Sequence, residues 1–133
     1  MSAPGTGHVL VVDDIAEQRE IYEAIFTHAG LRVLEAKDGE TAVGLARAHL
    51  PDVVLLDVCL PDLDGYEVVR RLKADPRTSR ISIVLLTACA LPADEAARAA
   101  AYDEFLVKPI EPRDALAAVL RQLHPPEADG RAA

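Results

Sequence analysis

The sequence predicts an α/β protein with a parallel sheet covered by helices on both faces, and three observations lead to this prediction. Short apolar runs alternate five times with segments whose apolar residues recur at helical spacing. The third run, "VVLL" at positions 53–56, is apolar throughout, as expected of a strand buried on both faces. The length of 133 residues suits one domain with a sizeable core.

Five strands are expected where the apolar runs lie, at residues 9–12, 31–34, 53–56, 81–86 and 105–107. Alternation of such strands with helices implies crossover connections, and therefore parallel pairing. Five units of this kind are consistent with the flavodoxin-like, doubly wound strand order 2-1-3-4-5, which is inferred from the fold class because periodicity alone cannot order strands.

The helices between these strands are predicted from residues at helical spacing. Gly30 is expected to end the first helix and Asp38 to cap the second, whereas Pro92 and Pro112 suit first helical positions. The Ala-rich segment 92–101 leaves its inward face undefined. The predicted inward faces are Ile21, Ala24, Ile25 and His28; Ala42, Leu45, Ala46 and His49; Val68, Val69 and Leu72; and Leu116, Val119, Leu120 and Leu123.

The predicted organisation is a flexible N-terminus at residues 1–7, one domain at 8–124 and a polar, disordered tail at 125–133. Lys and Arg number 14 against 22 Asp and Glu, so the net charge of −8 argues against direct nucleic acid binding. No apolar run approaches the roughly 20 residues that cross a bilayer. "MSAPGTGH" lacks signal-peptide features, and two cysteines suit a reducing compartment. We therefore expect a cytoplasmic protein without membrane association.

Polar residues gather where the predicted strands end. Asp13 and Asp14 follow the first strand, Asp57 the third, Thr87 the fourth and Lys108 the fifth. Ligands of open α/β sheets bind outside these carboxyl ends. Each residue alone has a simpler interpretation: the Asp pair as a helix cap, Thr87 as an ordinary strand residue, and Lys108 as a surface charge. Together their chemistry is compatible with one pocket.

Three adjacent carboxylates repel one another, and a divalent cation removes that conflict. Oxygen ligands in a partly hydrated site favour Mg²⁺, which often shares its shell with a phosphoryl group. Lys108 and Thr87 would then contact phosphoryl oxygens, and Asp57 would act as the nucleophile. Asp57 is either a solvated residue just outside the sheet or a residue whose surroundings are built for a carboxylate, because a buried Asp is paired or holds a metal.

The segments "VLVVDD", "VVLLDVCLPDLDGYEVVRRLK", "IVLLTA" and "EFLVKPI" resemble the receiver domains of two-component response regulators, over residues 8–123. The resemblance implies that Asp57 accepts a phosphoryl group from a histidine kinase or a histidine phosphotransfer protein. It also implies that Asp14, Asp57 and the backbone carbonyl of Cys59 ligate Mg²⁺, with Asp13 acting through water.

By the same resemblance, Thr87 and Lys108 contact the phosphoryl group and Phe105 changes rotamer on activation. The Lys108–Pro109 peptide bond is expected to be cis. The chain departs from the family pattern in "AAAYDEF", where Ala101 and Tyr102 stand in place of Gly-Ala, so the fourth helix is expected to end differently or to be short and mobile.

The leading functional hypothesis is a phosphorylatable signalling switch, not an enzyme with a separate substrate, which acts in a phosphorelay through contacts with an unknown downstream protein. A haloacid-dehalogenase-type phosphatase is the alternative, although Cys59 stands where that class requires a second acid. A flavodoxin-like cofactor binder would need a phosphate-binding loop after the first strand. Cys59 and Cys89 are interpreted as small buried thiols, with a redox-sensitive pair as the alternative.

Overall fold

The strands of the sheet confirm the predicted positions to within two residues. The computed structural model describes residues 7–88 and 102–124, so the predicted fourth helix, including Pro92, lies outside the described residues. The strands are β1 (His8–Val12), β2 (Arg32–Ala36), β3 (Val53–Asp57), β4 (Ser82–Thr87) and β5 (Glu104–Val107). Asp57 and Thr87 are thus the last residues of their strands rather than the residues that follow them.

The five strands form one parallel sheet in the order β2-β1-β3-β4-β5, which confirms the predicted order. The register places Val9 beside Val53, Asp57 beside Leu86 and Thr87 beside Val107. Because every strand runs the same way, the carboxyl ends of β1, β3, β4 and β5 meet at one edge of the sheet.

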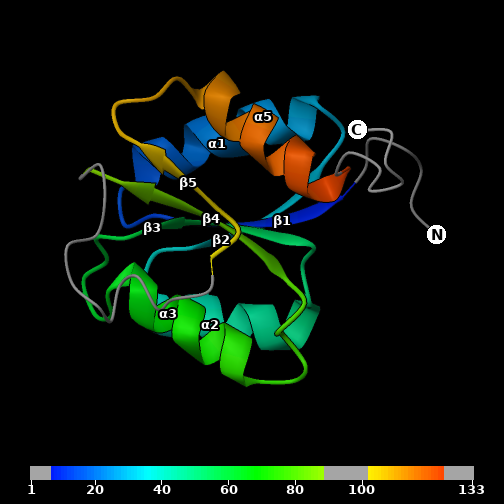
Figure 1. The fold of residues 1–133 in the computed structure, drawn as a ribbon. Helices are drawn as coiled ribbons and strands as arrows, with labels where there is room; N and C mark the ends of the chain where they lie inside the picture. Colours follow the sequence, from blue (N-terminus) through cyan, green and yellow to red (C-terminus); the bar gives the residue numbers. More distant parts are fainter. Residues whose placement is uncertain (1–6, 89–101, 125–133) are drawn as a thin grey trace, which may run out of the picture.

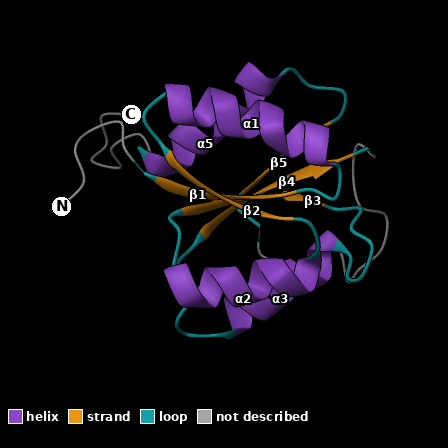
Figure 2. Ribbon diagram, turned by 180° about the vertical axis from the view of Figure 1, so that it is seen from behind, coloured by secondary structure: helices purple, strands orange, loops and turns teal. Residues whose placement is uncertain are grey.

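Two pairs of helices cover the sheet. The helices α1 (Ala16–His28) and α5 (Pro112–Leu123) lie on one face, and α2 (Gly39–His49) and α3 (Gly65–Ala74) lie on the other, as Figures 1 and 2 show from opposite sides. Successive strand residues point to opposite faces. Leu10 and Val54 therefore pack toward α2 and α3, while Val9 and Val53 pack toward α1 and α5.

The expected inward face of α1 was wrong by about one residue, although its Ile25 does pack against the core. Tyr22 and Phe26 are its buried residues and stack with ring centroids 5.9 Å apart. Ile21 is 44% exposed, and His28 is exposed as well. A shift of one residue turns a helix by about 100°, and the two large aromatic rings bury more apolar area than the aliphatic set would.

The inward faces of α2 and α5 show a smaller departure, whereas that of α3 was predicted correctly. Val43 is buried in α2 where His49 is exposed, and Ala115 and Ala118 lead the buried face of α5 ahead of the half-buried Leu116. Small residues allow a helix to approach a sheet closely, so apolar size alone does not identify the buried stripe.

The predicted helix ends are confirmed where they are described. Gly30 follows α1 with φ 92°, a left-handed conformation that glycine adopts at little cost. The Asp38 carboxylate accepts the Thr41 N–H at 2.8 Å, and Pro112 is the first residue of α5. In the described part of the chain, none of the helices combines the length and apolar character needed to cross a bilayer.

Candidate functional site

Three carboxylates meet at the carboxyl edge of the sheet. Asp13 and Asp14 follow β1, Asp57 ends β3, and each offers an oxygen within 4.8 Å of the other two. Asp13 and Asp57 are 1% and 4% exposed, whereas Asp14 is open to solvent. The sequence therefore predicted correctly that these carboxylates converge.

Asp13 has a buried oxygen without a partner. Its Oδ1 accepts the Ile15 N–H at 2.9 Å, while its buried Oδ2 has no hydrogen bond within the described residues. Burial raises the pKa of Asp13, and the nearby negative charge of Asp57 adds to the increase. An orphaned buried carboxylate oxygen is costly, and a bound cation would satisfy it.

Asp57 is held by two donors. Its Oδ1 accepts the Cys59 N–H at 2.9 Å, and its Oδ2 accepts from Lys108 Nζ at 2.8 Å. Burial alone would lower the pKa of Lys108, but the hydrogen bond and charge of Asp57, with the charge of Asp13, raise it. The ammonium group neutralises one of the three carboxylates, so the site keeps a surplus of negative charge.

The peptide after β5 carries Lys108 into this site. The Lys108–Pro109 bond is cis, as expected from the resemblance. The Lys108 N–H donates to the carbonyl oxygen of Thr87 at 2.7 Å, which ties the ends of β4 and β5 together. The Thr87 side chain is buried at the end of β4. Thr87 and Lys108 are thus on the predicted edge of the sheet.

An arginine that the sequence analysis did not identify supports the loop after β1. Arg19 of α1 donates from Nη1 to the Asp13 carbonyl oxygen at 2.7 Å and from Nε to Glu35 at 3.2 Å. It therefore joins α1, the acidic loop and β2. Its position in the first turns of α1 after two aspartates was the available signal, but its partner Glu35 is distant in sequence.

The remaining predicted residues are placed as follows. Phe105 is half-buried in β5 and meets Tyr102 edge-on, with ring centroids 5.8 Å apart. Cys59 is a free, exposed thiol, so its interpretation as a buried thiol was wrong. The loop after β3 turns outward there, which exposes the side chain while the backbone N–H holds Asp57. Cys89 lies outside the described residues.

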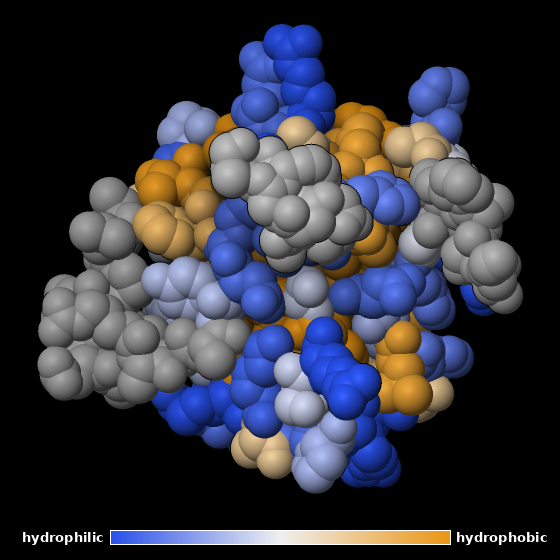
Figure 3. Space-filling model, turned by 45° about the vertical axis from the view of Figure 1, so that its right-hand side comes forward, coloured by the Kyte–Doolittle hydropathy of each residue, from blue (hydrophilic) through white to orange (hydrophobic). Residues whose placement is uncertain are grey.

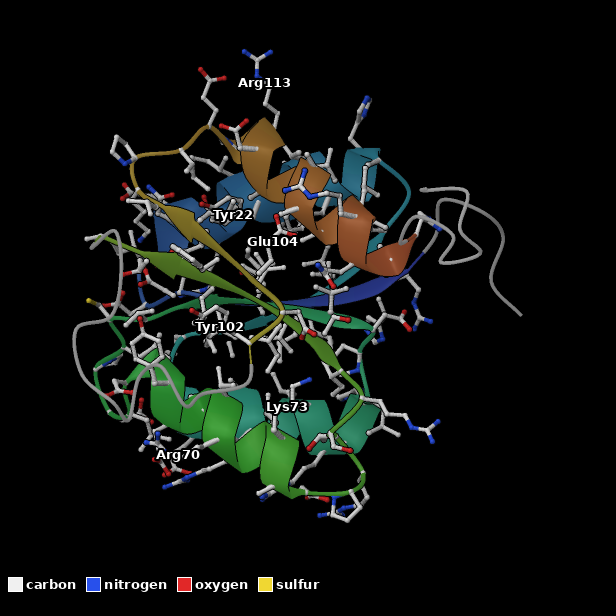
Figure 4. The ribbon with its side chains drawn as sticks, viewed as in Figure 1. Tyr22, Arg70, Lys73, Tyr102, Glu104 and Arg113 are labelled. Atoms are coloured by element: carbon white, nitrogen blue, oxygen red, sulfur yellow. The ribbon has the colours of Figure 1, made fainter. Side chains whose placement is uncertain are left out.

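A hollow of about 340 Å³ opens beside the acidic site, between α1 and the segment after β5. Tyr22 lies between α1 and the sheet on this side (Figure 4). Ile15, one of the lining residues, is 47% exposed. The lining residues are Ile15, Gln18, Tyr22, Lys108, Pro109 and Ile110.

The donor set fits a hard divalent cation. All three side chains offer carboxylate oxygens, and the oxygens lie close enough to share an ion. The orphaned Asp13 Oδ2 and the negative charge left over after Lys108 are both explained by a cation bound there. These residues therefore could hold Mg²⁺, whose preference for oxygen ligands matches the site.

Comparisons with known proteins agree with this geometry. The family model for the response regulator receiver domain matches residues 9–120. The response regulator PleD of Caulobacter vibrioides is 43% identical over 108 residues, which cover 80% of this chain and 24% of PleD. The chain therefore spans about a quarter of the length of that relative.

Two solved structures are similar over almost their whole length. The chemotaxis response regulator CheY4 of Vibrio cholerae has a TM-score of 0.81 and 29% identity, covering 88% of this chain and 98% of CheY4. The receiver domain of the sensor histidine kinase PA1611 from Pseudomonas aeruginosa has a TM-score of 0.77 and 33% identity, covering 88% of this chain and 96% of that domain. That structure has a magnesium ion coordinated in its active site cleft.

The comparisons give no support to the phosphatase alternative. The family match covers both aspartates after β1, the strand end at Asp57, and Thr87 and Lys108. The sheet order, the acidic edge and the family model thus agree, and the chain belongs to the receiver domain family of response regulators.

Proposed function

We propose that this receiver domain accepts a phosphoryl group on Asp57 from the histidine of a kinase or phosphotransfer protein. One observation carries the proposal: Asp57 is a buried strand-end carboxylate whose two oxygens are held by the Cys59 N–H and Lys108. Such an arrangement fixes a nucleophilic carboxylate at the sheet edge, where a donor can reach it.

The proposed transfer makes one bond and breaks one. An Asp57 carboxylate oxygen forms a bond to phosphorus while the bond between phosphorus and the donor's imidazole nitrogen breaks. The electron pair of the broken bond returns to that nitrogen, which leaves a neutral imidazole when the other ring nitrogen carries the proton. The product on this chain is an aspartyl phosphate.

Asp13, Asp14, Asp57 and the backbone carbonyl of Cys59 would hold Mg²⁺, with Asp13 acting through water as in the family. When bound, the ion neutralises negative charge on the phosphoryl oxygens. This assignment is supported by the clustered carboxylates and by the magnesium ion in the similar PA1611 receiver domain. The open position of Asp14 leaves room for water in the shell.

Lys108 and Thr87 would then contact the phosphoryl oxygens. The Lys108 ammonium, now paired with Asp57, would exchange part of that contact for a phosphoryl oxygen, and the Thr87 hydroxyl would donate a hydrogen bond. Phe105 lies in β5, the strand next to β4, which ends in Thr87, and its ring contacts Tyr102 edge-on. A change of the Phe105 rotamer would carry the signal to a downstream protein.

The hollow beside Lys108 is the proposed contact for the donor protein. It opens next to the nucleophile, and the half-exposed Ile15 gives it an apolar rim that a partner can cover. Histidine kinases act on receiver domains in the cytoplasm, so we propose that this chain acts there. Its role is that of a signalling switch that at most catalyses its own phosphorylation and dephosphorylation.

The direct test uses acetyl phosphate with Mg²⁺ and intact-mass measurement. Wild type is expected to gain one phosphoryl group, which Asp57→Ala should not acquire. Asp52→Ala is the matched control, because Asp52 lies at the opposite end of β3, where its carboxylate accepts the His8 N–H. Modification of Asp57→Ala to the wild-type extent would refute the assignment, as would an unmodified wild type.

A further inference from the structure

The loop between β3 and α3, residues 58–64, is fastened to the rest of the protein at both ends. At its start, the Cys59 N–H donates to Asp57 Oδ1, and the Gly65 N–H closes the loop onto the Val58 carbonyl at 2.8 Å. A Cβ added at Gly65 would lie 2.8 Å from Val58 Cα, so the two backbone segments touch. The start of the loop is thus held by short-range contacts.

The far part of the loop is fastened to a different helix. The Asp62 carboxylate accepts the Gly39 N–H at 2.8 Å and the Glu40 N–H at 2.9 Å, both at the start of α2. The Leu63 N–H donates to the same carboxylate at 2.7 Å. These hydrogen bonds lower the pKa of Asp62, and the bond from Gly39 is the largest cause. Asp62 therefore bridges two segments more than 20 residues apart.

This bridge is not needed to cap α2, because the helix has its own cap. Asp38 accepts the Thr41 N–H at 2.8 Å, as an N-cap aspartate ordinarily does. The neighbouring Leu63 packs directly over the start of the helix, since a Cβ added at Gly39 would lie 2.9 Å from Leu63 Cβ. The loop and the first residue of α2 are therefore in close contact.

We propose that Asp62 is a positioning residue for the magnesium site, which rests on the proposed function. Only two residues, Leu60 and Pro61, separate it from Cys59, whose carbonyl is the proposed backbone ligand. Anchoring Asp62 on α2 fixes the far end of that short loop, so the Cys59 carbonyl is held in place before the ion arrives. Groups that hydrogen-bond directly to metal ligands typically change metal affinity by 10–100-fold, and Asp62 acts through the intervening loop, so an effect at the low end of that range is expected.

The matched pair Asp62→Ala and Asp38→Ala separates positioning from helix capping. Both variants remove a carboxylate acceptor from the N-terminus of α2, so both should lower the midpoint of urea denaturation, Asp62→Ala by more because Asp62 accepts two helix N–H groups and Asp38 accepts one. Only Asp62→Ala should weaken Mg²⁺ binding, by about tenfold, in an NMR titration that follows the amide signals of Asp57 and Cys59. Without magnesium, Asp62→Ala should also speed hydrogen exchange at Gly39 and Glu40.

The outcomes are distinct. Equal magnesium affinities in the two alanine variants would overturn the inference while leaving the proposed function intact, whereas a wild type without a magnesium response would remove both. Asp62→Asn retains one acceptor oxygen and is a good cap, so it serves if the alanine variant does not fold. Its magnesium affinity is expected to lie between those of wild type and Asp62→Ala, and a wild-type affinity would then overturn the inference.

Discussion

The two edges of the sheet differ in how their charged side chains are paired. At the carboxyl edge, three carboxylates share one ammonium group, and one oxygen of Asp13 has no hydrogen bond within the described residues. At the amino edge, Lys73 of α3 reaches toward the sheet, donates to the carbonyls of Ser79 and Ile81 at 3.1 and 2.7 Å, and pairs with Asp103 at 3.5 Å (Figure 4).

Asp103 is satisfied in turn, because its carboxylate accepts the Ile83 N–H at 2.7 Å and its own N–H donates to the Ile83 carbonyl at 2.9 Å. The amino edge therefore joins α3, β4 and the entry to β5 through paired groups. Among the buried side-chain atoms of the described residues, the one oxygen without a hydrogen bond belongs to Asp13, at the edge proposed to bind an ion.

The outer surface does not repeat this separation. In Figure 3, hydrophilic and hydrophobic surface alternate over the face shown. Arg70 and Arg71 pair with Glu67 along α3, where each pair is exposed to water. Such exposed pairs contribute little to stability.

The largest expected effect is at the amino edge. Lys73→Met should lower the free energy of unfolding by about 2 kcal/mol, because two carbonyls and the Asp103 carboxylate lose their donor. Arg70→Met, on the same helix, is the matched control and should cost less than about 0.5 kcal/mol. Urea denaturation checks both values, and equal losses would remove the distinction between paired and surface charge.

At the carboxyl edge, removing a charge is expected to raise the free energy of unfolding rather than lower it. Asp13→Asn should raise the free energy of unfolding of the magnesium-free protein by about 1 kcal/mol, because it removes a poorly satisfied buried charge and keeps an acceptor for the Ile15 N–H. The same substitution should weaken magnesium binding. Asp14→Asn changes an exposed neighbour and should leave stability unchanged, so destabilisation by Asp13→Asn would contradict the account.

A third prediction concerns pH at the amino side of the molecule. Hydrogen bonds from Arg77, with the charge of Arg47, lower the pKa of Asp75 from 3.8 to about 2. Because the folded pKa is depressed, the stabilisation by Asp75 is present above about pH 4 and is lost as the pH falls toward 2. A carboxylate NMR titration should give a midpoint near 2. A midpoint near 3.8, or an equal acid sensitivity of Asp75→Asn and wild type, would contradict the pairing.

The smallest effect is expected for Arg113, which points away from the protein at the start of α5 (Figure 4). Its bond to Glu111 joins two side chains that are both largely exposed. Arg113→Ala should therefore change the free energy of unfolding by less than about 0.5 kcal/mol in either direction. A loss as large as that of Lys73→Met would show that exposed pairs matter here.

Much of the fold and of the site followed from the sequence because strand ends in a parallel sheet are a geometric constraint. Once residues 53–56 were recognised as a buried strand, the positions of Asp57, Asp13 and Lys108 at one edge were fixed by topology. The buried face of α1 was not predictable in this way, since Tyr22 and Ile21 both fit a helical repeat and only packing decides between them.

Contacts between segments that are distant in the sequence could not be predicted either. Asp62 lies 23 positions from Gly39, and Arg19 lies 16 positions from Glu35, so neither pairing leaves a local pattern. Cys59 was expected to be buried because free cysteine usually is, yet the outward turn after β3 exposes it. Loop direction depends on where the next helix is anchored, which sequence spacing does not express.

The strand order has a consequence for the proposed function. Lys108 and Asp57 are 51 positions apart in the sequence. They meet because β3 and β5 lie on either side of β4, with their carboxyl ends at the same edge of the sheet. A chain that is truncated before β5, or whose sheet is misassembled, does not bring Asp57 and Lys108 together. The proposed phosphorylation of Asp57 would therefore depend on an intact sheet, because its ammonium partner reaches it only from the end of β5.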